Sequence, residues 1–221
     1  PDPENLPEGL DWNLWLGPAK STPYSSAMHP FNWRGWWEYG TGALGDMGCH
    51  LIDIPFRALG LKYPTAVECS VGSVYRQMWT PEHLPQGCPP SSFVSINFDA
   101  TEINATPLTL EWSDGGIRPA HPDLIPPEDF LGDPGSNNGV MMIGEHGIIT
   151  TGVYGYNPRL YKKGQAVVTY GPKSIAKSRR SFLFIIRVRS MIPARWFRSS
   201  MEHTTPRKWA RPGRPAAHSA P

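Results

Sequence analysis

Three polar residues, Asp46, His50 and Asp53, follow one another at spacings of four and three within a short apolar run. On a helix, side chains three or four residues apart lie on one face. Free histidine titrates near neutral pH, so His50 can take a proton from a substrate hydroxyl within hydrogen-bond reach. Asp46, one turn earlier, can fix the imidazole or bind a second hydroxyl. We predict Asp46 and His50 as the catalytic residues.

An aromatic segment and a glycine-rich turn precede this run. Indole rings offer flat stacking surfaces and arginine offers hydrogen bonds, a combination that holds sugars. Glycines permit close backbone approach and positive φ, which suits a ligand lying at the start of a helix. The predicted substrate-binding residues are Arg34, Trp33, Trp36, Trp37 and Tyr39.

Each of these residues also has a simpler interpretation. An Asp and a His four residues apart often form a surface helix pair worth a few tenths of a kcal/mol. Asp53 is followed four residues later by Arg57, which favours a structural salt bridge. Asp46, His50 and Asp53 together could hold a metal, but no companion cluster of ligands accompanies them. We expect at least half of the nine tryptophans to be core residues, and His146 to lie in a turn.

The elements that position these residues follow from periodicity. Apolar residues of broadly helical period predict a helix from Thr41 or Gly42 to Gly60, disturbed near Pro55. After Pro64, β-branched and alternating residues predict strands at 66–75, 92–98 and 108–112, a hairpin over 139–153, and short edge strands at 160–161 and 166–170. The predicted fold class is α+β, with an open, largely antiparallel or mixed sheet and helix packed on one face.

Segments rich in Pro, Asn, Asp and Gly predict irregular structure elsewhere. Residues 1–31 are interpreted as an extended lead-in, not a helix, that lays aromatic anchors on another surface. Residues 76–91 and 117–138 are predicted to be loops. The chain begins without Met, so we interpret it as a piece of a longer protein.

Composition narrows the class further. No window approaches the roughly 18 apolar residues of a membrane span, so no membrane partner is expected. The three cysteines have unrelated spacings, which indicates reduced thiols, each more simply a small buried residue than a nucleophile.

Charge divides the chain in two. Residues 173–221 carry twelve Lys and Arg against the single acid Glu202. The whole chain has 21 basic and 19 acidic residues, so positions 1–172 hold nine basic and eighteen acidic residues. We predict a substrate domain at 1–174 and an irregular basic tail at 175–221. A nucleic-acid arm is one interpretation of this tail. A segment with no evolved fold, translated out of frame, is the one we favour, so a nucleic-acid partner is not expected.

Several of these stretches resemble one protein family. Residues 9–17, 32–37, 40–53, 144–147 and 155–159 are similar to the C-terminal half of bacterial Gfo/Idh/MocA oxidoreductases. The resemblance implies that His50 is the general base that takes a proton from a sugar or cyclitol hydroxyl, while Asp46 orients substrate and histidine. It also implies an N-terminal Rossmann domain that binds NAD or NADP, and a sheet that often mediates homo-oligomers.

The chain lacks two features that this resemblance implies. The stretch from Gly40 to Gly45 has glycines at the required spacing but no preceding apolar strand, and a Glu-Lys-Pro segment that carries a catalytic lysine is absent. We therefore expect NAD or NADP to be bound by a missing domain in cis. The chain alone is expected to bind no cofactor and to be inactive.

Three functions remain open. The first is the substrate half of a nicotinamide-dependent oxidoreductase that acts on a sugar, sugar derivative or cyclitol. The second is a glycosidase of the same family that uses NAD for transient oxidation. The third is a non-catalytic module for oligomerisation or carbohydrate binding. The compartment, whether cytoplasmic or periplasmic, is left open.

Overall fold

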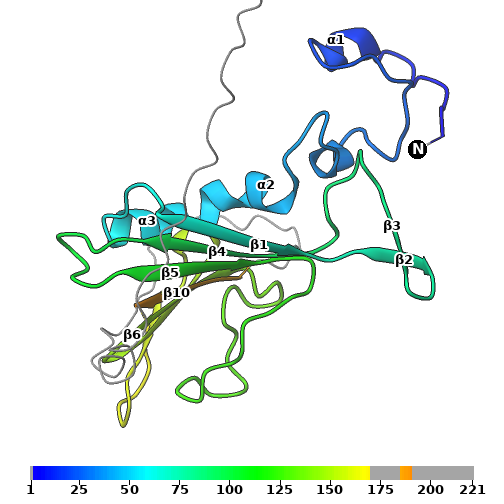
Figure 1. Cartoon of the computed structure of the whole chain (residues 1–221). Helices are drawn as coiled ribbons and strands as arrows, with labels where there is room; N and C mark the ends of the chain where they lie inside the picture. The colour runs from blue at the N-terminus through cyan, green and yellow to red at the C-terminus, as the bar shows by residue number, and fades with distance from the viewer. Residues whose placement is uncertain (1, 170–184, 191–221) are drawn as a thin grey trace, which may run out of the picture. The chain divides into compact units, whose positions relative to one another are not determined.

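A mixed eight-stranded sheet dominates the computed structural model, which describes residues 2–169 and the backbone of residues 185–190 (Figure 1). All described neighbours in the sheet are antiparallel except β10 and β6, which run parallel. In spatial order the strands are β1 (Ala66–Val71), β4 (Ser92–Phe98), β5 (Leu108–Ser113), β10 (Ile185–Ser190), β6 (Gly139–Gly144), β7 (Gly147–Gly152), β8 (Arg159–Tyr161) and β9 (Val168–Thr169).

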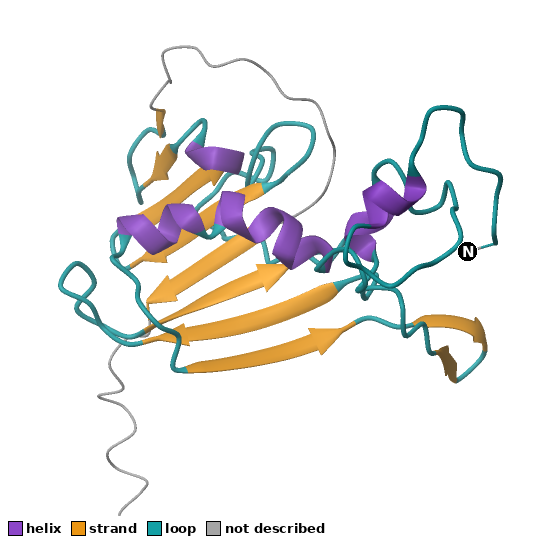
Figure 2. Cartoon of the chain, turned by 90° about the horizontal axis from the view of Figure 1, so that it is seen from above, coloured by secondary structure: helices purple, strands orange, loops and turns teal. Residues whose placement is uncertain are grey.

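Two consecutive helices, α2 (Gly42–Leu51) and α3 (Asp53–Ala58), lie across one face of the sheet (Figure 2). Leu51 at the end of α2 is fully buried and packs with the inward residues of β4, β5 and β6. The buried members of this cluster are Leu51, Leu61, Val94, Phe98, Leu108, Leu110, Trp112 and Val140. The predicted α+β class, with helix packed on one face of an open sheet, is confirmed.

The predicted disturbance near Pro55 is present. Proline has no N–H to donate to the carbonyl of Leu51, four residues earlier, and the helix breaks at Ile52. Pro55 then occupies the first turn of α3, where a missing donor costs nothing. Helix α3 ends at Ala58, and Gly60, just past the C-cap Leu59, has a φ of 61° that allows the N–H of Leu61 to reach the carbonyl of Phe56 at 2.9 Å.

The opposite face of the sheet is covered by the loop over residues 117–138. Adjacent residues of β6 point to opposite faces, so Val140 belongs to the core under the helices and Met141 to a second core. Ile125 and Leu131 from the loop pack in that second core against Met141, Ile148 and Tyr161. The loop predicted from its Pro and Asp content therefore buries apolar side chains of its own.

The strand predicted over 66–75 divides at Gly72 and Ser73. The β1 part joins the sheet as an edge strand, exposed throughout. The β2 part (Val74–Gln77) pairs instead with β3 (Thr80–Glu82), forming a hairpin that extends into the segment predicted as a loop. The loop prediction was wrong there because Thr80 and Pro81 form an edge strand, a position that does not need the proline N–H.

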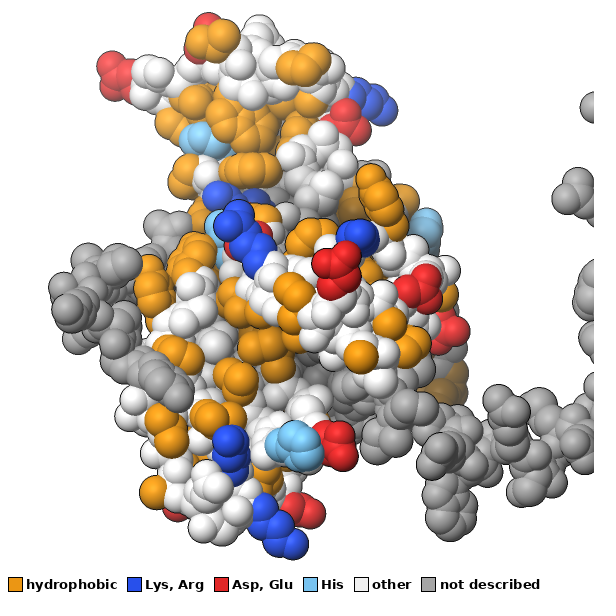
Figure 3. All heavy atoms as spheres, turned by 90° about the vertical axis from the view of Figure 1, so that its left-hand side faces the viewer, with side chains coloured by type: hydrophobic (Ala, Val, Ile, Leu, Met, Phe, Trp, Pro, Cys, Tyr) orange, Lys and Arg blue, Asp and Glu red, His pale blue; other side chains and the backbone are white. Residues whose placement is uncertain are grey.

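Hydrophobic side chains reach the surface in several places (Figure 3). Met78 and Trp79 at the tip of the β2–β3 hairpin are 80% and 87% exposed, and Val67 and Val71 on β1 are more than half exposed. No helix within the described residues has the length and apolar character to cross a membrane.

The lead-in contains a short helix that the sequence interpretation missed. Helix α1 (Trp12–Leu16) begins where the carboxylate of Asp11 accepts the Leu14 N–H at 2.9 Å. Trp12 stacks on Trp15 with a centroid separation of 4.5 Å and packs edge-on against Tyr24. The aromatic residues form a cluster chiefly among themselves.

The remaining structural expectations concern His146, the cysteines and the basic tail. His146 lies in the two-residue turn between β6 and β7, within the predicted hairpin. All three cysteines are free, but Cys49 and Cys69 are exposed, so the expectation of burial was wrong for these two. Of the expected tail, Ile185–Ser190 form β10, and the rest lies outside the described residues.

Candidate functional site

Helix α2 places Asp46 and His50 one turn apart on the same face, as predicted. Gly42 opens the helix with a φ of 67°, and a Cβ there would lie 3.1 Å from the Cβ of Cys88. The Cys88 N–H bonds to the carbonyl of Gly35 at 2.8 Å, and burial raises the pKa of the Cys88 thiol. The loop at Cys88 thus fixes the segment before α2 against the helix start.

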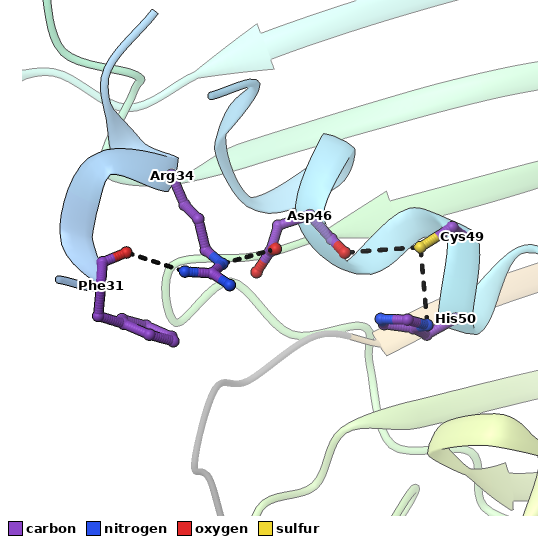
Figure 4. Close-up of polar contacts among 5 residues, drawn as sticks. All are labelled: Phe31, Arg34, Asp46, Cys49 and His50. Carbon is purple, nitrogen blue, oxygen red and sulfur yellow. Dashed lines mark hydrogen bonds and ion pairs between the residues drawn. The ribbon is translucent and has the colours of Figure 1, made fainter. Parts of the chain in front are cut away.

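Arg34 joins this preceding segment to the helix. It lies in the 3-10 helix η1 (Asn32–Gly35), and its Nε donates to Oδ1 of Asp46 at 3.0 Å (Figure 4). Its NH1 donates to the carbonyl of Phe31 at 3.1 Å, and its guanidinium lies over the rings of Phe31 and Trp33, at 4.3 and 4.6 Å from their centroids. Four contacts therefore hold the cation in one position.

Close backbone packing supports this arrangement. A Cβ on Gly40 would lie 2.5 to 2.7 Å from backbone atoms of Arg34, so only glycine allows the chain to pass there. A Cβ on Gly45 would lie against the side chain of Thr41, the N-cap residue of α2. Close packing thus explains glycine at positions 40, 42 and 45.

A pocket of about 390 Å³ opens between η1 and the first turns of α2. Most of the residues predicted to bind substrate line it, together with residues that the prediction did not include. The lining residues are Trp33, Arg34, Trp37, Glu38, Tyr39, Gly40, Thr41, Gly45 and Asp46. Trp37 is 53% exposed, which leaves its ring accessible to a ligand.

Three predicted residues are placed differently. Trp36 packs against the cluster around Trp12, and its backbone forms a bridge with Gly87. The Tyr39 hydroxyl makes a hydrogen bond with Thr22, so the ring lines the pocket while the hydroxyl is engaged elsewhere. His50 lies one turn beyond the lining residues, on the same face of α2 as Asp46.

The His50 imidazole has its own neighbours. Its Nδ1 lies 3.6 Å from the Sγ of Cys49, and that thiol also donates toward the carbonyl of Asp46 at 3.6 Å (Figure 4). The ring packs against Tyr154, with centroids 4.8 Å apart and planes at 61°. This contact could not be predicted from spacing in the sequence, because only the fold brings Tyr154, just after β7, to α2.

Asp53, the third member of the pattern, lies at the start of α3 and forms an ion pair of its own. Its Oδ1 accepts a hydrogen bond from Nε of Arg57 at 2.8 Å, in a pair whose side chains are both more than half exposed. The predicted salt bridge between Asp53 and Arg57 is confirmed. Within the described residues, no three His, Cys, Asp or Glu side chains are grouped to hold a metal ion.

The described residues do not fit a dinucleotide. A dinucleotide-binding turn follows a parallel strand and leaves room for a pyrophosphate over its glycines. Here η1 and a turn precede Gly40, and the space over Gly40 and Gly45 is filled by Arg34 and Thr41. These residues therefore leave no place for a pyrophosphate at Gly40 and Gly45.

The sheet, its helical layer and the pocket at the start of α2 define an α+β domain with a candidate small-molecule site. Residues 2–75 match a protein-family model described as "Oxidoreductase family, C-terminal alpha/beta domain", of the Gfo/Idh/MocA group. The resemblance seen in the sequence is thereby confirmed over η1, α2 and α3, the elements that carry the site. Comparison with curated proteins found no match.

Proposed function

We propose that this chain is the substrate-binding half of a nicotinamide-dependent oxidoreductase that acts on a hydroxyl of a sugar, sugar derivative or cyclitol. One observation carries the proposal: α2 presents a carboxylate, held by Arg34, and an imidazole one turn later on the same face, beside an aromatic pocket. The nicotinamide would be held by another domain and would accept the hydride.

The pocket suits a polyol for three reasons. Trp33 and Trp37 supply flat apolar surfaces against which the C–H groups of a ring can lie. Oδ1 of Asp46 is engaged by Arg34, while Oδ2 has no hydrogen bond to another described residue and can accept one from a hydroxyl. Glu38 adds a second carboxylate, whose Oε1 accepts the Lys20 N–H at 2.8 Å.

His50 would serve as general base through Nε2. This role requires the tautomer that carries its hydrogen on Nδ1, which lies 3.6 Å from Sγ of Cys49. Nε2 is then the proton acceptor. Asp46 binds a neighbouring hydroxyl and thereby places the reacting one within reach of Nε2.

A non-catalytic carbohydrate-binding module is the second candidate. It is favoured by the placement of His50 one turn outside the lining of the pocket. The homo-oligomer expected through the sheet also remains a proposal, supported by the exposed edge strand β1. Sedimentation velocity of the chain tests it: a monomer at high concentration contradicts the oligomer.

Turnover separates enzyme from module. His50→Ala, in a protein that carries this domain together with its nicotinamide-binding domain, should lower kcat by about 10²–10⁴-fold and leave cofactor affinity unchanged. His146→Ala is the matched control, because His146 lies in the β6–β7 turn. Retained turnover in His50→Ala contradicts the proposed catalysis. Product analysis distinguishes net NADH formation, expected here, from sugar release without net reduction.

A further inference from the structure

Tyr154 has a backbone conformation that an ordinary side chain avoids. Its φ and ψ are 61° and 17°, in the left-handed region, within the short 3-10 helix η2 (Val153–Gly155). Glycine adopts this region freely, whereas a residue with a bulky side chain is strained there. Tyr154 is also 54% exposed, so burial of its ring offsets only part of that strain.

The surrounding backbone imposes this conformation. The N–H of Val153 donates to Oδ2 of Asp133 at 3.0 Å, and the N–H of Gly152 donates to the carbonyl of Tyr156 at 2.7 Å. A Cβ on Gly152 would lie against the Asp133 carboxylate, so that loop is packed directly on the end of β7. Residues on both sides of Tyr154 are therefore fixed independently of its side chain.

The Tyr154 side chain contacts His50, the proposed general base. The centroids of the Tyr154 and His50 rings are 4.8 Å apart, and those of Tyr154 and Tyr156 are 5.9 Å apart. Cys49 meets Nδ1 at one edge of the imidazole, and the second ring nitrogen faces away from that thiol (Figure 4). A ring held at one edge and packed against an aromatic neighbour cannot turn over without losing one of the two contacts.

We propose that Tyr154 is a positioning residue that holds the His50 imidazole with Nε2 directed at the substrate. The inference rests on the proposed function, since the orientation of His50 matters to turnover only if His50 is the base. The end of β7, which is far from α2 in the sequence, would then also contribute to the site. The strained backbone at Tyr154 delivers the ring to that place.

The test compares Tyr154→Gly with Asn157→Gly. Both residues have positive φ, 61° and 49°, so glycine relieves strain at each and both variants should unfold at the same or a higher temperature than the wild type. Only Tyr154→Gly removes the ring from His50. Tyr154→Phe keeps the ring and serves as the conservative variant.

The main readout is heteronuclear NMR of the His50 imidazole in the chain. In Tyr154→Gly the ring-current shifts should disappear and the ring should populate a second orientation, whereas Asn157→Gly and Tyr154→Phe should keep the wild-type signals. Identical His50 signals in Tyr154→Gly overturn the proposal. With the nicotinamide-binding domain present, Tyr154→Gly should lower kcat about tenfold while KM changes little.

The two proposals fail in different ways. If His50 reorients in Tyr154→Gly but His50→Ala retains turnover, the positioning of the ring stands and the proposed catalysis fails. If His50→Ala abolishes turnover but Tyr154→Gly leaves both the His50 signals and kcat unchanged, the catalysis stands and the positioning role fails.

Discussion

The Nε atom of Arg34 lies 3.0 Å from Oδ1 of Asp46 and ties the 3-10 helix η1 to α2. About a third of each side chain is exposed, and the guanidinium also lies over two aromatic rings. The more exposed pair of Arg57 and Asp53 on α3 has neither aromatic contact nor partial burial to strengthen it. The two pairs therefore form a matched comparison.

Arg34→Ala should destabilise the chain by about 1 kcal/mol, because it removes a partly buried ion pair and two cation–π contacts. Arg57→Ala should cost only about 0.3 kcal/mol, the value of an exposed i,i+4 pair. Urea unfolding of both variants measures the difference. Equal losses would show that the aromatic contacts of Arg34 contribute nothing.

Gly40→Ala should disrupt the site by displacing the backbone of Arg34. The added Cβ would lie 2.5 Å from the Arg34 carbonyl oxygen, whereas a Cβ on Gly35 meets nothing within 4 Å. We expect a loss of about 1–3 kcal/mol for Gly40→Ala, as for other substitutions that overpack, and about 1 kcal/mol or less for Gly35→Ala. A loss at Gly35 as large as that at Gly40 would contradict the packing argument.

Asp133 makes stability depend on pH. Burial raises the pKa of its carboxyl above the ordinary value, against the opposing effects of the Val153 N–H and Arg159. A raised pKa in the folded state favours folding below the unfolded pKa of about 4, and this contribution is lost as pH rises through the folded pKa. Asp133→Asn has no carboxyl to titrate, so it does not lose this contribution as pH rises. The unfolding free energy of the variant minus that of the wild type should therefore increase from about pH 4 to pH 7 in urea titrations. A relative stability that is constant or falls over this range would contradict the burial effect.

The chain by itself should not bind NADH or NADPH detectably. The stretch from Gly40 to Gly45 follows η1 instead of a parallel strand, and Gly40 and Gly45 are packed against Arg34 and Thr41. Cofactor fluorescence titration at micromolar concentrations measures this. A low-micromolar affinity would contradict the separation of substrate and cofactor sites.

Local pattern predicted much of this fold. The strand at 92–98 and the hairpin over 139–153 were predicted because alternation and turn residues are properties of neighbouring positions. Pro55 likewise predicted the break between α2 and α3. Helix α1 was missed although Asp11 is a good N-cap, because five residues are too few to show a period.

Contacts between distant segments could not be predicted in this way. The insertion of β10 between β5 and β6 depends on pairings across more than forty residues. Asp46 and His50 were identified from their spacing, but the contact of Tyr154 with His50 depends on how β7 ends over α2. Candidate residues were thus predicted from sequence, whereas the neighbours that hold them were found only in the structure.

If the start of α2 forms a polyol site, titration of the isotope-labelled chain with monosaccharides and cyclitols, followed by NMR, should detect it. We expect shifts in Trp33, Trp37, Asp46 and His50 that disappear in Arg34→Ala and persist in Arg57→Ala. Shifts confined to the aromatic cluster around Trp12, or shifts that survive in Arg34→Ala, would contradict the proposed polyol site.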